Sequence, residues 1–430
     1  MADDNAYAVI GKLKLQEVDG ANTLQMGFYN GLPFAVQKDL TEDDLCIIFF
    51  PDSQLSEEYA IANDCVQRID ENGNRAGGFF GKNRKVRSVK FMKGKIHSVG
   101  YVAKIDTLAF TGFDLSKLNE GANVTELNGI PIANKFVNEA TRRAARNKDK
   151  SLSQEREMLG LKMHKDTGQY YKHKDNFQDR DLVTWTEKLD GTSVRFGEVY
   201  NERKFNWAQR LLNKLTPLQK YDKKFVTGTR RTLLNDSKKT FYDTGNQPNI
   251  YREMTEPYKD KLHQGEAIYA EIVGWLDKTR PLFERGGVKF TYGCVPGERK
   301  LFVYRITWTL PDGTEMDLPW EHVKERCAEL GLHSVPELYA SYYYDDADYL
   351  SWDDDNTPID ILPDHIESMT NQFTEGKSTL DHSHIREGCV IRVDRGRDTF
   401  FYKSKSEEYY GLEDAFKNDD SNVDIEEAQG

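Results

Sequence analysis

The chain has 430 residues, of which 38% are hydrophobic, so it can build cores for two or three domains and is not disordered throughout. No run approaches the roughly 20 apolar residues of a membrane span, and the acidic amino end lacks the apolar stretch of a secretory signal. The net charge of −12 argues against a general coat protein for nucleic acid, and five scattered cysteines favour reduced thiols over disulfides or zinc. We therefore expect a cytoplasmic protein that makes no contact with membranes.

Residues 1–135 are predicted to form a small β-rich domain. Strand-like segments at 6–15, 23–29 and 45–50 are separated by turns rich in Gly and Asp, and helical patterns are scarce. A succession of short strands is typical of a small barrel or sandwich. The polar stretch that follows, 136–180, predicts a helix and a linker.

A basic stretch lies near the end of this region, at residues 82–95, and contains no Asp or Glu. A local basic run on an acidic protein suits the binding of a polyanion at a defined site, although such runs also occur as ordinary solvated surface. We therefore predict that this stretch binds nucleic acid. The candidate residues are Lys82, Arg84, Lys85, Arg87, Lys90, Lys93 and Lys95.

The pattern changes at residue 181. From there to residue 417, strand-like segments alternate with helical ones, which predicts an α+β domain with largely antiparallel sheets. The acidic segment 345–364 is expected to be a surface insertion, and its role does not follow from the sequence. Residues 418–430 are expected to form an acidic, disordered tail.

The sharpest motif in the chain is E-K-L-D-G-T, in which Lys188 ends a strand pattern and Asp190 and Gly191 follow. An amine can attack phosphorus only after losing its proton, and burial or neighbouring cations favour that loss. The glycine permits a tight turn that brings the backbone close to a nucleotide. K-x-D-G alone is a weak signal, because chance produces it in about one chain in ten of this length.

Further chemical residues follow the motif in order along the chain. They are an arginine, an acid within an apolar strand, two aromatic residues on one strand, an acid before a strand, and two lysines on one strand face. The residues are Arg230, Glu271, Phe302, Tyr304, Glu387, Lys403 and Lys405. Each has an ordinary explanation when read singly, as a core residue or an exposed lysine. Their common order is much harder to explain by chance.

This ordered set resembles the covalent nucleotidyltransferase superfamily of ATP-dependent RNA ligases, DNA ligases and capping guanylyltransferases, over residues 181–406. The resemblance implies an ATP-grasp-like ligase domain in which Lys188 attacks ATP and carries AMP. Glu387 matches the acid that helps to bind a hydrated metal ion, which would be Mg²⁺ or Mn²⁺.

The resemblance also implies which side chains bind ATP and AMP. Asp190 would hold the ribose or steady the lysine, and Arg230 would contact phosphate. Glu271 would bind a ribose hydroxyl, Tyr304 would stack on the base with Phe302 as its rival, and the late lysines would contact the phosphates. The full set is Glu187, Asp190, Gly191, Arg195, Arg230, Glu271, Tyr304, Phe302, Lys403 and Lys405.

Two features resemble RNA ligases more than other members of the superfamily. Only about 25 residues follow Lys405, too few for the OB barrel that capping enzymes and minimal DNA ligases carry there. The β-rich region comes first instead, as in a branch of RNA ligases with an N-terminal OB module. The E-K-L-D-G-T-S form, with Arg195 as the next arginine, also looks like RNA ligases.

We therefore predict an ATP-dependent RNA ligase with an N-terminal OB-like barrel. It would act as a monomer in RNA repair and join 3′-hydroxyl to 5′-phosphate ends of nicked or free RNA through lysyl-AMP. A DNA ligase and a non-catalytic protein that binds RNA ends stay open as alternatives. The sequence does not give the natural substrate or the preference for nick or single strand.

Overall fold

The computed structural model describes residues 6–69, 71, 73–146, 155–216, 218–234, 249–344, 363–419 and 422–423. Most of the predicted insertion at 345–364 and most of the predicted tail at 418–430 lie outside these residues. None of the described helices combines the length and the apolar character that crossing a bilayer requires.

The chain divides into two compact units. Unit 1 comprises Met1–Asn138, Gly168–Asp175 and Glu407–Asp419, and unit 2 comprises Glu139–Thr167, Asn176–Ser406 and Asp420–Gly430. The predicted boundaries at residues 135 and 180 stay predictions about which segments fold as independent domains.

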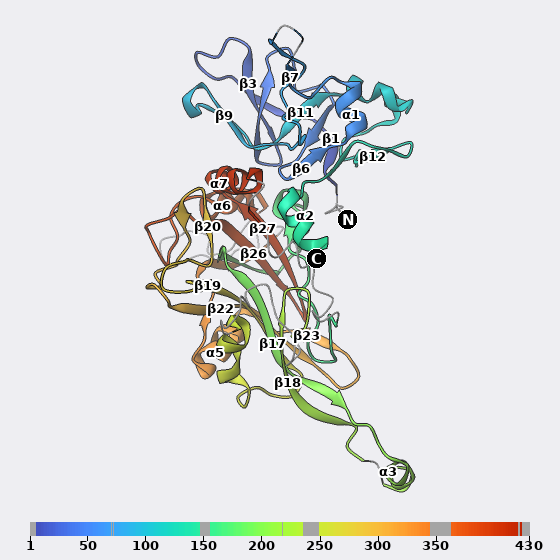
Figure 1. Cartoon of the computed structure of the whole chain (residues 1–430), viewed down its shortest axis with the longest axis vertical. Helices are drawn as coiled ribbons and strands as arrows, with labels where there is room; N and C mark the ends of the chain where they lie inside the picture. Colours follow the sequence, from blue (N-terminus) through green and yellow to red (C-terminus); the bar gives the residue numbers. More distant parts are fainter. Residues whose placement is uncertain are drawn as a thin grey trace. The chain divides into compact units, whose positions relative to one another are not determined.

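Unit 1 consists mainly of short antiparallel strands (Figure 1). One sheet has the order β1-β5-β11 and is formed by Ala8–Gly11, Cys46–Phe49 and Tyr101–Lys104. A second has the order β2-β3-β4 and is formed by Lys14–Gln16, Leu24–Tyr29 and Leu32–Gln37. The two-stranded ladders are β6 (Ser53–Leu55) with β14 (Ala133–Lys135), β7 (Arg68–Ile69) with β8 (Arg75–Ala76), β9 (Val89–Phe91) with β10 (Ile96–Ser98), and β12 (Glu126–Leu127) with β13 (Ile130–Pro131).

The remaining elements of unit 1 are short helices, one further short strand, and one longer helix near the carboxyl end. They are α1 (Glu57–Ala62), η1 (Met92–Gly94), η2 (Ile105–Thr111), η3 (Leu115–Lys117), β15 (Gly168–Gln169), η4 (Tyr170–Lys172) and α7 (Glu407–Asn418).

The central strand β5 is buried on both faces and separates two apolar clusters. Ile47 and Phe49 pack into a cluster with Tyr59 of α1, whereas Ile48 packs on the other face with Phe34 of β4. Successive side chains of a strand point to opposite faces, so a fully apolar strand of this kind needs a cover on each side. No closed barrel is found among the described strands, so the OB barrel stays a prediction.

One member of the basic stretch is part of the interior of unit 1. The side chain of Lys85 is fully buried, and its Nζ lies 2.5 Å from Asp414 Oδ1 on α7. Burial lowers the pKa of Lys85 and raises that of Asp414, while their mutual attraction opposes both shifts. Arg84 also turns inward and donates to the Leu55 carbonyl at 3.1 Å. These two residues differ from the predicted exposed basic surface, because tertiary packing gives them partners within the protein.

Replacing Lys85 by methionine is expected to destabilise unit 1 by roughly 3–5 kcal/mol, because Asp414 would stay buried without its counterion. Lys90→Met, at an exposed position of the same stretch, is the matched control and should leave the unfolding midpoint nearly unchanged. Thermal or urea unfolding measures both variants. Normal stability combined with weaker RNA binding in Lys85→Met would show that this side chain faces RNA instead.

Unit 2 is an α+β assembly dominated by two sheets, as predicted. One has the strand order β27-β26-β16-β25, formed by Asp398–Lys405, Gly388–Arg395, Leu182–Lys188 and Glu337–Tyr342. The other has the order β18-β17-β19-β22-β23, formed by Tyr221–Thr229, Thr192–Glu202, Glu266–Gly274, Arg299–Thr309 and Glu315–Asp317. The short β24 (His333–Ser334) runs parallel to β22, and β20 (Glu284–Arg285) pairs with β21 (Val288–Lys289).

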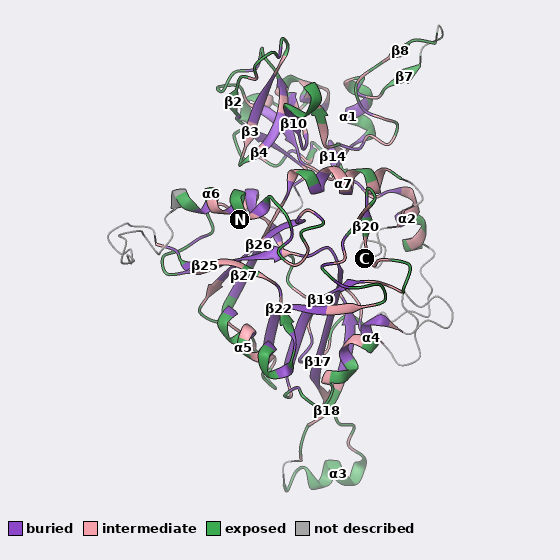
Figure 2. Cartoon of the chain, turned by 90° about the vertical axis from the view of Figure 1, so that its left-hand side faces the viewer, coloured by how far each residue is buried: buried purple, intermediate pink, exposed green. Residues whose placement is uncertain are grey.

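The helices of unit 2 are α2 (Glu139–Arg146), α3 (Trp207–Leu212), α4 (Ile250–Thr255), η5 (Glu256–Tyr258), α5 (Trp320–Leu330) and α6 (Pro363–Thr374). Of these, α4, α5 and α6 pack against strands of the two sheets. Trp185 of β16 donates to Thr370 of α6 at 3.0 Å, and Thr192 of β17 hydrogen-bonds Tyr251 of α4 at 2.9 Å. The strands β17, β19 and β22 are largely buried (Figure 2).

The inner faces of the two sheets meet through side chains of unit 2. Arg392 of β26 donates to the Tyr304 carbonyl of β22 at 3.3 Å. The ring of His164 contacts both Tyr304 and Phe401 of β27, at centroid distances of 5.0 and 5.2 Å. The sheets therefore pack face to face, and residues on their inner faces are brought together.

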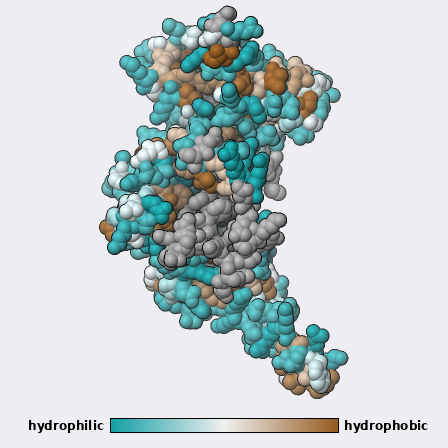
Figure 3. Space-filling view, in the orientation of Figure 1, coloured by the Kyte–Doolittle hydropathy of each residue, from teal (hydrophilic) through white to brown (hydrophobic). Residues whose placement is uncertain are grey.

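The β17–β18 hairpin projects beyond the sheet and carries α3 at its tip (Figure 1). A capping box between Asn206 and Gln209 holds the start of this short helix. Its apolar side chains are not buried: Trp207 is 81% exposed and Leu211 is 59% exposed. Figure 3 shows apolar surface at this tip.

Candidate active site

Strand register places Lys188 beside the late lysines. Lys188 pairs with Gly388 on β26, and Gly388 in turn pairs with Lys405 on β27. Two residues earlier on the same face of β16, Thr186 pairs with Val390 on β26, and Val390 pairs with Lys403 on β27. Paired residues and residues two apart share a face of a sheet, so all three lysines stand on the inner face.

Gly388 is required between the two lysine-bearing strands. Its φ is 148°, and a Cβ at this position would lie 2.0 Å from the Ser404 carbonyl oxygen. Any side chain would therefore clash with β27, and it would also occupy the space between Lys188 and Lys405. The glycine keeps the neighbouring strands close and leaves the row of lysines unobstructed.

Glu387 provides a negative charge beside the three lysines of the inner sheet face. Its Oε1 lies 2.7 Å from Lys188 Nζ, and only 4% of the Glu387 side chain is exposed, against 24% for Lys188. Burial raises the pKa of Glu387, the nearby Asp190 raises it further, and Lys188 and Lys405 oppose the shift. Glu387 Oε2 is buried and has no hydrogen-bond partner among the described residues.

The lysines are close enough to influence one another's ionisation. Burial lowers the pKa of Lys403 to about 8, and Lys405, Lys188 and Arg230 contribute in the same direction. Arg230 follows β18 and reaches Asp166 at 3.6 Å. The structure thus gathers the predicted cations into one partly buried cluster that an anion would stabilise.

The K-x-D-G turn is held by two residues that the sequence does not single out. Arg285 of β20 makes a bidentate ion pair with the buried Asp190 carboxylate, with distances of 2.7 and 3.0 Å. The Asp190 backbone N–H donates to the Tyr292 hydroxyl at 2.5 Å. Burial raises the Tyr292 pKa well above its ordinary value, so this hydroxyl stays neutral. Asp190 therefore fixes the turn after the nucleophile candidate.

Gly191 allows the turn to lie against β19. A Cβ here would come within 2.5 Å of the Ile272 carbonyl oxygen and 2.7 Å of Glu271 Cγ. The next residues pair in register with β19, including Ser193 with Glu271. Close backbone approach is thus the reason for the glycine, and it brings Glu271 beside the turn.

The two aromatic candidates on β22 have different surroundings. The pairing with β19 shifts register at Tyr304, which is left as an extra, bulged residue. The Tyr304 hydroxyl hydrogen-bonds Ser193 at 2.9 Å, and the ring is partly exposed. Phe302 is only 4% exposed and packs against the His333 ring. Tyr304 is therefore the more accessible of the two rings.

His164 is a further residue of this region that the sequence does not single out. Its ring lies between Tyr304 and Phe401, one from each sheet. Burial and the nearby Arg305 and Arg230 lower its pKa well below the ordinary value, so the ring is neutral. No local pattern marks this histidine, because its neighbours come from distant strands.

The structure gives Glu187 and Arg195 partners other than a nucleotide. Glu187 alternates with Lys188 on β16, so it faces α6, and its Oε2 accepts from the Thr379 N–H and hydroxyl at 2.8 and 2.6 Å. Arg195 is 1% exposed and donates to the backbone carbonyls of Thr229 and Arg156. Both side chains hold loops next to the site and differ from the predicted ATP contacts.

Comparison with known proteins assigns the family. The model of the RNA ligase family matches residues 181–405, which is more than half of the chain. The chain therefore belongs to the RNA ligase family, which confirms the family predicted from the sequence. No curated protein matches it.

Solved structures of Naegleria gruberi RNA ligase variants share the fold. An apo variant has a TM-score of 0.56 and 15% identity, covering 95% of this chain and 98% of that one. A variant with ATP and Mn has a TM-score of 0.55 and 16% identity, covering 94% and 97%. Another, with AMP and Mn, has a TM-score of 0.53 and 15% identity, covering 94% and 98%. At this level of identity, the likeness shows a common fold.

Replacing Arg285 by methionine is expected to lower stability by roughly 3–5 kcal/mol, because it leaves the Asp190 carboxylate buried without a counterion. The double variant Asp190→Asn/Arg285→Met should recover much of this loss. Urea unfolding of the full chain measures the effect.

The matched control for this prediction is Arg280→Met. Arg280 forms an exposed ion pair with Asp277, so its loss should hardly change the unfolding midpoint. Equal effects of Arg280→Met and Arg285→Met would contradict the role given to the buried pair.

Proposed function

We propose that this RNA ligase forms lysyl-AMP on Lys188 and passes the AMP to a 5′-phosphate end. The observation that carries this proposal is the alignment of Lys188 with Lys403 and Lys405 on one sheet face, with Glu387 at 2.7 Å from the Lys188 amine. A nucleophilic amine beside a cluster of cations suits attack on a polyphosphate.

In the first step, Lys188 Nζ attacks the α-phosphorus of ATP in line. A phosphorus–nitrogen bond forms, the bond to the bridging oxygen breaks, and pyrophosphate leaves with the bonding electrons. The Nζ proton needs an acceptor, and Glu387 Oε1 is placed to receive it.

Lys403 and Lys405 would bind the β- and γ-phosphates. Their charges offset the negative charge that accumulates on the leaving pyrophosphate, and they are positioned before the reaction begins. Arg230, which contributes to the same cluster of cations, would contact phosphate as well. This explains why the fold keeps mutually repelling cations together.

A divalent metal fits beside Glu387. One carboxylate oxygen there lacks a partner, and Mg²⁺ or Mn²⁺ commonly uses one or two carboxylates together with substrate phosphates and water. No group of three His, Cys, Asp or Glu that could hold a metal by itself occurs among the described residues. When bound, the metal would neutralise phosphate charge. The Naegleria ligase variants determined with ATP and Mn, or AMP and Mn, support this choice.

Tyr304 is the residue we propose to stack on the adenine, because its ring is partly exposed where that of Phe302 is buried. Glu271, next to the K-x-D-G turn, would accept a hydrogen bond from a ribose hydroxyl. Asp190 would act indirectly, by fixing the turn through Arg285.

The later steps use RNA. The AMP moves from Lys188 to a 5′-phosphate, and a 3′-hydroxyl then attacks that phosphate and releases AMP. The exposed members of the basic stretch would bind the RNA backbone, through phosphate contacts that depend on salt. They are Lys82, Arg87, Lys90, Lys93 and Lys95.

Lys188→Ala is expected to abolish covalent labelling by ATP that carries label in its α-phosphate. The assay incubates the full chain with ATP and Mg²⁺ or Mn²⁺, denatures it and measures retained label. Lys278→Ala, which removes an exposed lysine of unit 2, should retain normal labelling. Label that persists in Lys188→Ala would remove this residue from its proposed role.

The first step should also lose efficiency in alkali. Lys403 has a folded-state pKa of about 8, so its charge disappears as the pH rises through this value. If that charge binds ATP, kcat/KM for self-adenylylation by wild type should fall above this pH, by up to about tenfold per pH unit. In Lys403→Arg this fall should be absent, because arginine stays protonated.

The comparison of wild type with Lys403→Arg tests this group, because the substitution keeps a cation at the position and removes only its loss of charge with rising pH. A falling limb of equal steepness in the two proteins would contradict the assignment. Self-adenylylation rates measured at subsaturating ATP across pH 7 to 10 provide the test.

A further inference from the structure

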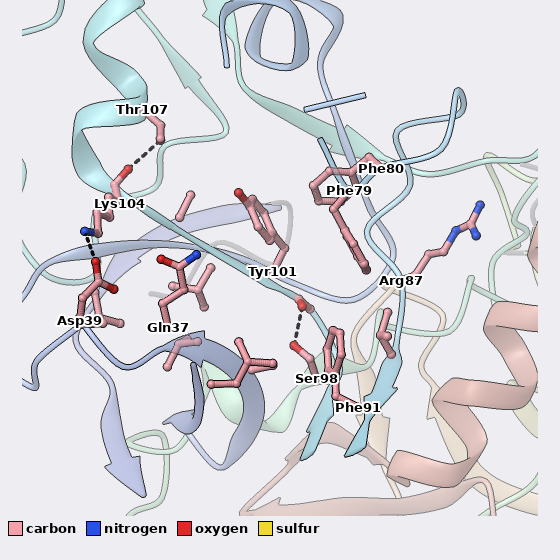
Figure 4. A pocket seen from close by; sticks show the side chains of 18 of the residues that line it. Gln37, Asp39, Phe79, Phe80, Arg87, Phe91, Ser98, Tyr101, Lys104 and Thr107 are labelled. Atoms are coloured by element: carbon pink, nitrogen blue, oxygen red, sulfur yellow. Dashed lines mark hydrogen bonds and ion pairs between the residues drawn. The ribbon is translucent and has the colours of Figure 1, made fainter. Parts of the chain in front are cut away.

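A pocket of about 460 Å³ opens on unit 1 and is lined only by residues of that unit. Its walls come from β4, from the β9 to β11 region and from the start of η2 (Figure 4). The volume is typical of a site for a small molecule or a single group of a larger ligand.

Aromatic rings line one side of this pocket. Phe79 is 62% exposed, and its ring lies 6.4 Å from that of Phe91 at an angle of 37°. Behind them, Phe80 packs edge-on against Tyr101 at 4.9 Å, which ties this side to the core of the unit. An exposed ring at the mouth of a pocket is accessible to a ligand that enters the pocket.

Polar groups accompany these rings. Gln37, at the end of β4, lines the pocket, and its side-chain amide has no hydrogen-bond partner among the described residues. Arg87 stands at the rim, exposed and without an ion pair within the described part of the chain (Figure 4). By contrast, the other cation of the lining, Lys104, is paired with Asp39 at 2.8 Å. Asp106, at the start of η2, is a further exposed carboxylate of the lining, so the lining as a whole carries no net charge. Arg87 is the cation of the lining that is left without an ion pair among the described residues and can bind an anionic group of a ligand.

Building on the RNA ligase function proposed above, we propose that this pocket holds one unpaired base of the RNA. Phe79 and Phe91 offer a π-face on which any base can stack. The Gln37 amide can donate to and accept from a base edge, and Arg87 can bind the adjoining phosphate. An apolar peptide would match the rings but would leave the guanidinium of Arg87 without an anion.

The geometry makes a specific demand on the RNA. A base within a duplex is stacked and paired, so it cannot enter the pocket, whereas a base in an overhang or a free end can. The phosphate contacts of the basic stretch would serve duplex and single strand alike. The pocket therefore adds affinity only for RNA that carries an unpaired base.

The test uses the full chain and a short single-stranded RNA that carries the fluorescent base 2-aminopurine at successive positions. At one position, wild type should quench the fluorescence. Phe79→Ala should remove that quench and weaken binding roughly 5- to 150-fold, the range that corresponds to one lost base–aromatic stack. Ile61→Ala, which truncates a 73% exposed apolar side chain outside the pocket, is the matched control and should behave as wild type.

A second measurement identifies the base as the group that binds. RNA with an abasic site at the quenched position should lose as much affinity for wild type as intact RNA loses for Phe79→Ala. The two changes together should add little, because both remove the same contact.

Two outcomes would overturn the proposal. Unchanged affinity in Phe79→Ala would show that the pocket serves another partner, and an equal loss on single-stranded RNA and blunt duplex would show that no unpaired base is involved. Failure of the proposed function is recognised separately, because it removes ATP labelling from wild type. Lys188→Ala lacks that label but should keep the quench.

Discussion

Mutual repulsion among the lysines of unit 2 is the constraint on which the site depends. Strand pairing holds Lys188, Lys403 and Lys405 on one sheet face, and the lowered pKa of Lys403 is a direct consequence. A slip of one residue in the register would turn these side chains towards α6, so the register of three strands has to be kept against this repulsion. Gly388 permits the strand contact, and Glu387 supplies a compensating charge. A bound polyphosphate would relieve the remaining excess of positive charge, which makes ATP a stabilising ligand of the folded site.

The same constraint explains why the turn after Lys188 is held by buried contacts. Lys188 can remain in place only if the turn that follows it is rigid, and that rigidity comes from a buried ion pair and a buried hydroxyl. Asp190 is thus better understood through Arg285 than through direct contact with a nucleotide. Glu187 and Arg195 similarly brace loops on either side of the site.

How far the sequence predicts this arrangement depends on the range of the interactions. Strand alternation correctly placed Lys403 and Lys405 on one face, and the ordered motifs identified the family, because both rest on local spacing. The same alternation puts Glu187 on the opposite face of the strand from Lys188, which argues against a contact between Glu187 and ATP. Arg285 and His164 could not be found, since their partners are distant in sequence and no local pattern marks them. Lys85 shows the same limit: its charge belongs to a basic run, yet its partner on α7 lies 329 residues away.

Selectivity for RNA must reside elsewhere than in the aromatic pocket. Stacking on Phe79 and Phe91 reads the face of a base, and contacts of Arg87 or Lys90 read phosphate, so neither distinguishes ribose from deoxyribose. Only groups that contact a 2′-hydroxyl can do so. The reacting 3′-hydroxyl neighbours that group and has to approach the 5′-phosphate that received AMP from Lys188. We therefore expect discrimination between RNA and DNA ends to come from the inner sheet faces of unit 2. The pocket of unit 1 would then decide where unpaired RNA binds, and the catalytic unit would decide which ends are joined.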